Sequence, residues 1–111
     1  LATSSPASEP ALQERIKIVA VAKNATSVTV YVQNLGAVPV KVSAVYIIAA
    51  NGTLLCSNTT PTDNTTISPS TIGEIVVDSN CANVLSIGTY TVKVVTGRGT
   101  EAYYTLTIAA S

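Results

Sequence analysis

The stretch TSVTVYVQNL, residues 26–35, decides the fold class, because its apolar and polar side chains alternate without a break. Valine holds one face of the expected strand, and polar or tyrosine side chains hold the other: Val28, Val30 and Val32 against Thr29, Tyr31 and Gln33. A period of two residues is typical of a β-strand with one buried face. The segment therefore predicts a strand that covers a core.

The same kind of pattern recurs in six further segments, with turn residues between them. These are RIKIVAVAK (15–23), VPVKVSAVYIIAA (38–50), TLLC (53–56), IGEIVVD (72–78), GTYTVKVVT (88–96) and TEAYYTLTIA (100–109). Within residues 38–50 the apolar phase moves from Val40 and Val42 to Val45 and Ile47, which predicts a bulge or burial of both faces. Seven short strands without a convincing amphipathic helix predict an all-β fold, an antiparallel immunoglobulin-like β-sandwich.

Tyr90 lies in the sequence IGTY at the start of the segment 88–96. This is where immunoglobulin-like folds carry a tyrosine corner, in which the hydroxyl bonds to backbone a few residues upstream. Because Gly-x-Tyr is a common sequence, a tyrosine that is simply packed in the core is an equally good interpretation.

Length and charge limit the function classes. The 111 residues suffice for one domain with one core. Six basic and six acidic residues give a net charge of zero, so neither nucleic acid nor an acidic lipid surface is expected as a partner. We expect a tether over residues 1–14, LATSSPASEPALQE, and a β-sandwich domain over residues 15–111.

Membrane attachment is not encoded within this stretch of chain. No run of about 18 apolar residues occurs, and no signal peptide is visible. Because the chain opens with Leu1, we expect a processed form or a fragment, with any export signal or membrane helix upstream.

Cys56 and Cys81 are the two cysteines of the chain. They could form a disulfide, remain as two buried thiols, or supply half of a metal site. Zinc lacks ligands, because the chain has no histidine and no further cysteine. We expect a disulfide, which implies an oxidising compartment, although intracellular proteins of hyperthermophiles also carry disulfides.

Four Asn-x-Thr sequons start at Asn24, Asn51, Asn58 and Asn64. Roughly two would arise from this composition by chance, so the number alone indicates little. Each lies in a predicted turn or loop, where a glycan could be carried outside the core, and they are therefore candidates for glycosylation. Two lie in the polar segment CSNTTPTDNTTISPS, residues 56–70, whose Ser, Thr and Asn could instead simply solvate a loop.

No catalytic residues are expected. Triads and dyads that use histidine are impossible, since the chain has none. Glu9 and Glu14 lie in the expected tether. Glu74 and Asp78 share a strand face about 13 Å apart, which is farther than the carboxylate pairs of glycosidases.

No metal or cofactor site is expected either. Calcium could bind only if two loops met, with oxygen ligands from Asp63, Asn64, Asp78 and Asn80, and calcium sites usually show a denser run of ligands. The glycines of TGRGT, residues 96–100, indicate a hairpin turn and not a phosphate cradle, because no helix follows.

Most of the chain resembles the extracellular domain of archaeal type IV pilin-like proteins, a group that includes adhesive pilins, archaellins and archaellum stator proteins. The resemblance lies in a strand ending in Asn-x-Gly, a VPV strand start, and a late Gly-x-Tyr strand running into TGRG, within residues 15–108. It implies a non-catalytic structural protein of a motility or adhesion filament at the archaeal cell surface, anchoring the filament to the S-layer or forming part of it. The hydrophobic N-terminal helix of the group is absent from this sequence.

A small secreted carbohydrate- or protein-binding module is the alternative function. Sugar-binding faces usually present Trp or Tyr platforms. The chain has no tryptophan and five tyrosines, which disfavours this alternative without removing it.

The last expected strand supplies the candidate interaction surface. It carries no charge after Glu101, and natural proteins usually protect edge strands with charge. We therefore expect Tyr103, Tyr104 and Leu106 to contact S-layer protein or sister filament subunits, or to form a homodimer.

Overall fold

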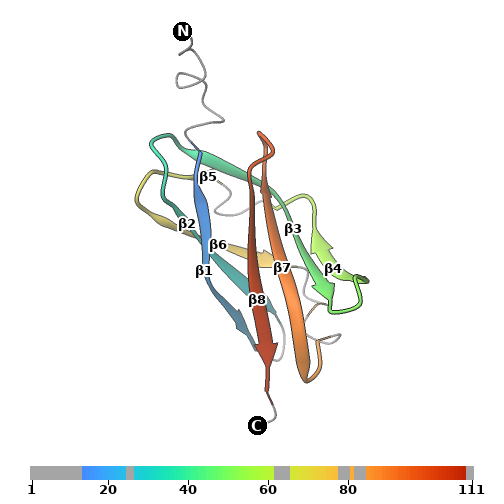
Figure 1. The fold of residues 1–111 in the computed structure, drawn as a ribbon. Helices are drawn as coiled ribbons and strands as arrows, with labels where there is room; N and C mark the ends of the chain where they lie inside the picture. The colour runs from blue at the N-terminus through green and yellow to red at the C-terminus, as the bar shows by residue number, and fades with distance from the viewer. Residues whose placement is uncertain (1–13, 25–26, 62–65, 78–80, 82–84, 110–111) are drawn as a thin grey trace, which may run out of the picture.

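The computed structural model describes residues 14–24, 27–61, 66–77, 81 and 85–109, and its elements are eight β-strands (Figure 1). They are β1 (Ile16–Lys23), β2 (Val28–Asn34), β3 (Val40–Ala49), β4 (Leu54–Asn58), β5 (Thr66–Ile67), β6 (Ile72–Val77), β7 (Gly88–Thr96) and β8 (Glu101–Ile108). Seven of them correspond to the seven predicted strands. The eighth, β5, has only two residues, too few for a periodic pattern to reveal it.

The strands form two sheets in which every pairing is antiparallel. One sheet has the order β1-β2-β6, and the other has the order β4-β3-β7-β8 with β5 on β3. The division matches the immunoglobulin arrangement, with A, B and E in one sheet and C, F and G in the other. The predicted all-β sandwich is confirmed.

The core fills the space between the sheets and is built mainly from valine and isoleucine. The buried valines of β2 are those that the alternation predicted. They lie beside the buried residues of β6 in the same sheet and face those of β3 and β7 in the other. Fully buried side chains include Val28, Val30, Val32, Val45, Ile47, Ile75, Val92 and Val94. Thr29, Tyr31 and Gln33 of β2 lie on the outer face of the three-stranded sheet.

The predicted irregularity in β3 is a bulge. The register of β3 against β7 shifts between Val42 and Ala44, and its register against β4 shifts between Ile47 and Ile48. An extra residue in one strand moves the following side chains to the opposite face. As a result, Tyr46 and Ile48 are only partly buried, while Val45 and Ile47 are fully buried.

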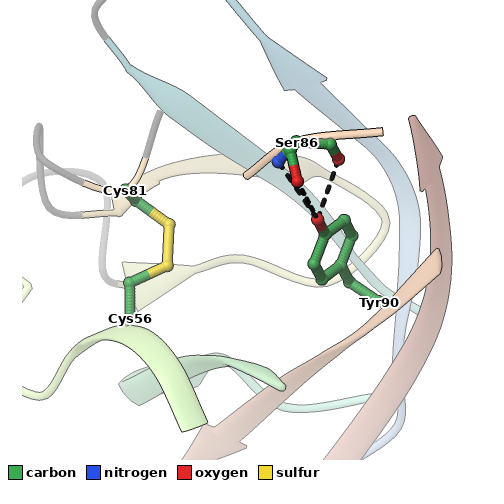
Figure 2. The surroundings of a disulfide bond; sticks show 4 residues. All are labelled: Cys56, Cys81, Ser86 and Tyr90. Carbon is green, nitrogen blue, oxygen red and sulfur yellow. Dashed lines mark hydrogen bonds between the residues drawn. A yellow bond between two sulfur atoms is a disulfide. The ribbon is translucent and has the colours of Figure 1, made fainter. Parts of the chain in front are cut away.

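Tyr90 forms a tyrosine corner (Figure 2). Its hydroxyl donates to the carbonyl oxygen of Ser86 at 2.8 Å and accepts from the amide of Ser86 at 3.1 Å. Gly88 between them has φ of +153°, and a Cβ there would lie 3.6 Å from the tyrosine oxygen. The hydroxyl therefore holds the chain that leads into β7.

Asn34, at the end of β2, is a fully buried polar side chain. Its amide nitrogen donates to the carbonyl oxygens of Val38 at 2.8 Å and Ile67 at 2.9 Å, and its oxygen accepts from the amide of Gly36 at 2.8 Å. The Asn-x-Gly sequence is thus a side-chain-supported turn that also holds β5. Both amide hydrogens and one lone pair of the amide oxygen are therefore used.

The first and last described strands, β1 and β8, run along the same margin of the sandwich. β1 begins at the same end as the turn between β7 and β8, and β8 runs toward the opposite end (Figure 1). β1 and β8 lie against each other where the two sheets meet. Among the described residues there is no helix of the length and apolarity that crossing a bilayer requires.

Candidate interaction surfaces

The outer face of β8 carries the sequence-predicted surface only in part. Tyr103 is 58% exposed, but Leu106 is 8% exposed and belongs to the core, and Tyr104 is partly buried against the core. The pleat places Glu101, Tyr103 and Thr105 outward and Ala102 and Leu106 inward. The expectation of an exposed Leu106 is wrong, because this residue has the same phase as the buried Tyr90 of β7, its partner in the sheet.

Tyr103 is held by two charged neighbours. Its hydroxyl donates to Glu101 Oε1 at 2.7 Å, and Lys93 Nζ lies 3.4 Å from Glu101 Oε2 and 5.8 Å from the centre of the tyrosine ring. The hydrogen bond raises the pKa of Tyr103 and lowers the pKa of Glu101. Desolvation alone would lower the pKa of Lys93, but attraction to Glu101 and Tyr103 outweighs it, so the net shift is upward. The charges of this face are therefore compensated locally.

The backbone of β8 offers an edge. Among the described strands, β8 pairs with β7 alone. The turn closes with a hydrogen bond from Thr96 N to Thr100 O, and hydrogen-bonded pairs alternate along an antiparallel ladder. Residues 101, 103, 105 and 107 therefore direct their backbone amides and carbonyls away from β7, toward the edge, where another strand could pair.

A shallow hollow of about 320 Å³ lies on the same sheet, beside this face. Its walls include the apolar side chains of Tyr46, Ile48, Leu54 and Val95. Leu54 is 53% exposed. Pairing of Tyr46 with Lys93 and of Lys93 with Tyr103 lines up these three side chains across β3, β7 and β8. We call this set, together with Glu101 and Thr105, the β8 face.

Cys56 of β4 and Cys81 form a disulfide, with their Cα atoms 5.6 Å apart (Figure 2). The prediction of this bridge is confirmed. It joins an edge strand of the five-stranded sheet to the segment that follows β6 of the other sheet. Beside it, Asn58 Nδ2 donates to the carbonyl oxygen of Val76 at 2.9 Å, so a hydrogen bond and a covalent bond connect the two sheets along one side.

The sequon asparagines differ in their surroundings. Asn24 and Asn51 are exposed, and their side-chain oxygens accept from the backbone amides of Ser27 and Thr53. Asn58 is partly buried, and the amide nitrogen that would carry a glycan is the one bonded to β6. Asn64 lies outside the described residues. Glycosylation of all four remains a prediction.

Glu14 is a site residue that the sequence interpretation placed in a tether. Residues 1–13 of that tether lie outside the described residues, but the Glu14 side chain is 1% exposed and contacts the turn between β7 and β8. Its Oε1 accepts from the hydroxyls of Thr96 at 2.8 Å and Thr100 at 2.7 Å, and its Oε2 accepts from Arg98 Nη1 at 2.9 Å. Burial raises the pKa of Glu14, but these hydrogen bonds and the charge of Arg98 outweigh it, so the pKa lies below its ordinary value. The carboxylate is therefore ionised in the folded protein at neutral pH.

Within the described part of the chain, no group of three or more His, Cys, Asp or Glu side chains could hold a metal ion. The four side chains weighed for calcium, Asp63, Asn64, Asp78 and Asn80, lie outside the described residues. Glu74 lies on the exposed face of β6, opposite Tyr31.

The sequence and the fold give different comparisons with known proteins. No protein-family model and no curated protein matches the sequence. Among solved structures, the archaellum periplasmic stator protein FlaG from Sulfolobus acidocaldarius matches with a TM-score of 0.63 and 17% identity, over 84% of this chain and 99% of that chain. A structure of the stator complex of FlaF and FlaG from the same organism matches with the same TM-score and identity, over 96% of this chain and 98% of that chain. This chain therefore has the β-sandwich fold of the archaellum periplasmic stator proteins, matched over nearly their whole length.

Proposed function

We propose that this chain is a non-catalytic component of an archaellum or a related archaeal surface filament, and that it acts outside the cell as a stator-type module. The observation that carries the proposal is the extent of the fold match, at least 84% of this chain and 98% of the stator chains. The wider type IV pilin-like grouping, with a hydrophobic helix before Leu1, is part of the proposal. The coding sequence upstream of Leu1 tests that part directly.

The disulfide supports the placement outside the cytoplasm. Disulfides persist in oxidising compartments and are rare where glutathione keeps thiols reduced. The Cys56–Cys81 bridge is between sheets of a small domain with a low content of large apolar side chains, where a covalent bond adds substantially to stability.

The β8 face is the surface that we assign to partner binding. It combines an edge strand that pairs only with β7 among the described strands, an exposed Tyr103 and a shallow apolar hollow. Its Lys93 and Glu101 pair with each other, so the face presents little net charge to a partner. We propose that it contacts S-layer protein or sister subunits by strand pairing and apolar contact.

Sedimentation of the purified domain, alone and with isolated S-layer, tests this assignment. Tyr103→Lys and Thr105→Lys place a charge on the β8 face without entering the core, and each should weaken association or S-layer binding at least roughly tenfold. Tyr31→Lys is the matched control, because Tyr31 points outward from the other sheet. Circular dichroism establishes that each variant is folded.

The outcomes are distinct. Loss of binding in the β8 variants but not in Tyr31→Lys supports the assignment, and binding should change little with salt because few charges take part. A wild-type domain that stays monomeric at high concentration and ignores the S-layer would contradict it. Equal losses in all three variants would move the contact away from the β8 face.

Glycan binding is a second candidate function for the same face. The row Tyr46–Lys93–Tyr103 spans three adjacent strands, so the two tyrosines stand roughly 10 Å apart across the sheet with a donor between them. Aromatic rings spaced along a flat sheet can stack on successive sugars. Calorimetric titration with S-layer glycans released from their protein distinguishes the two functions. Only a glycan-binding module should bind the released glycans, and its affinity for them should be lost in Tyr46→Ala.

A further inference from the structure

Glu14 is a buried carboxylate at the point where the N-terminal segment enters the sandwich. It lies two residues before β1, its side chain is 1% exposed, and its partners are 82 to 86 residues away in the sequence. A charged side chain is almost never buried unless it is paired. The proposed partner-binding surface makes no use of this arrangement.

The turn between β7 and β8 binds this carboxylate through side-chain hydrogen-bond donors. Three donors converge on it: the Thr96 and Thr100 hydroxyls on one oxygen and the Arg98 guanidinium on the other, all within 2.9 Å. Hydrogen bonds to an ionised acceptor are shorter and stronger than neutral ones. The site is specific for an anion, because hydroxyl and guanidinium hydrogens all point to the same place.

The backbone of the turn sets these donors in position. Thr96 N donates to Thr100 O at 2.9 Å, and Gly99 N donates to Thr96 O at 3.0 Å. Gly99 has φ of +93°, which favours glycine. Thr96 Oγ1 accepts from Thr100 N at 3.1 Å, so its only hydrogen is available for Glu14.

The same turn is tied to the rest of its sheet, and Glu14 is tied to the other sheet. Gly97 N donates to Lys41 O of β3 at 2.9 Å. Next to Glu14, Arg15 O accepts from Leu35 N at 2.7 Å, just beyond the end of β2. The start of β1 therefore contacts both sheets at one point, at the end of the sandwich where β1 begins (Figure 1).

We propose that the Thr96–Thr100 turn is a carboxylate-binding site for Glu14, and that this contact is a mechanical joint through which tension on the N-terminal segment enters both sheets. It goes beyond the proposed function, because it holds for any partner of the domain. If the β8 face does bind the partner, tension passes from Glu14 through the turn to β8 without crossing the core.

The need for such a joint follows from the position of β1. Its pairing is confined to β2 among the described strands, so it is an edge strand. Tension applied only to β1 would separate it from β2 pair by pair, beginning at the hydrogen bond from Leu35 N to Arg15 O. With Glu14 bound to the turn, the three hydrogen bonds of its carboxylate must break before tension can reach the β1–β2 ladder.

Two measurements on the whole chain test the joint. The first is amide hydrogen exchange at Leu35, Thr96 and Gly97, whose amides donate to Arg15 O, Thr100 O and Lys41 O. The second is the unfolding rate under constant load between handles at the two chain ends. The variants are Glu14→Gln, which turns an amide group toward Arg98, and Thr100→Val, which removes one hydroxyl without changing shape. Glu74→Gln is the control, because it neutralises an exposed carboxylate on β6.

We expect exchange at these amides, and unfolding under load, to accelerate roughly ten- to a hundredfold in both joint variants and to stay unchanged in Glu74→Gln. The double variant should fall short of the product of the two single effects, because both remove parts of one site. Wild-type rates in Glu14→Gln and Thr100→Val would overturn the proposal. An equal rise at the core amides of Val30 and Val92 would also overturn it, since Glu14 would then serve general stability and not a local joint.

Discussion

Replacement of Asn34 tests directly how much its buried side-chain hydrogen bonds contribute to the stability of this fold. Asn34→Ala removes two donated hydrogen bonds, to Val38 O and Ile67 O, and one accepted from Gly36 N. A neutral hydrogen bond contributes about 1 kcal/mol net, and a buried polar group left without a partner costs about 1–3 kcal/mol. With some rehydration of the loop carbonyls, we expect the free energy of unfolding to fall by about 3–5 kcal/mol. That is a large part of the 5–15 kcal/mol typical of a domain.

Urea unfolding followed by circular dichroism at neutral pH measures this loss. The midpoint should fall while the slope m stays unchanged, because the surface exposed on unfolding is nearly the same. Thermal unfolding should show a midpoint lower by at least roughly 12 °C, at 4–8 °C for each kcal/mol in a domain of this size.

Two further variants sharpen the test. Asn34→Asp keeps the acceptor for Gly36 N but turns a second oxygen toward two carbonyl oxygens, so it should cost at least as much as Asn34→Ala. Gln33→Ala, one residue earlier and on the outer face of the sheet, should cost less than about 0.5 kcal/mol. A loss below about 1 kcal/mol for Asn34→Ala would refute the reasoning, because the buried carbonyls would then have found other partners.

Three more predictions concern the disulfide, the tyrosine corner and the buried carboxylate. Alkylation of unfolded protein should label Cys56 and Cys81 only after reduction, and replacing both by alanine should lower stability by roughly 3–4 kcal/mol, as expected for a loop closed over 25 residues; labelling without reductant would contradict the bridge. Tyr90→Phe should cost about 1–3 kcal/mol in urea unfolding, because the two hydrogen bonds to Ser86 are lost; an unchanged midpoint would show that only ring packing matters. Because the pKa of Glu14 is lowered on folding, its ionised carboxylate stabilises the fold fully above the unfolded pKa near 4.5, and this stabilisation is lost as the pH falls through the folded pKa. The difference in unfolding free energy between wild type and Glu14→Gln should therefore be constant near neutral pH and shrink below about pH 4.5. A difference that grows on acidification would contradict a lowered pKa of Glu14.

The strands were predictable because each buries one face and alternates with period two. Val28, Val30 and Val32 are buried as the pattern requires, and the phase change after Val42 correctly indicated a bulge. The extent of β4 was underestimated, because its side chains show no alternation: Leu54 is exposed and the four residues after it are all partly buried. The predictable part of the fold is therefore the part whose burial is periodic.

The contacts of single polar residues were less predictable, because they depend on segments distant in the sequence. Glu14 follows a stretch with two prolines and four small hydroxyl residues, which is typical of a linker, and its partners lie more than 80 residues away. Threonines on either side of Gly-Arg-Gly were a usable signal for anion binding, but the segment was interpreted as a hairpin turn and only a phosphate cradle was considered and rejected. Leu106 was assigned to the surface although it shares its phase with buried residues of β8.

The connections along one side of the sandwich determine how it can open. The Cys56–Cys81 bond joins β4 to the segment after β6, and the hydrogen bond from Asn58 to Val76 joins β4 to β6 itself. The sheets can then part first only along the opposite margin, where β1 and β8 meet. These are the first and last of the described strands. The sheets would therefore separate first at the terminal strands, while β4 and β6 stay joined. An opened molecule would expose the inner surfaces of its terminal strands and would keep the pairing partners of its middle strands within reach for closure.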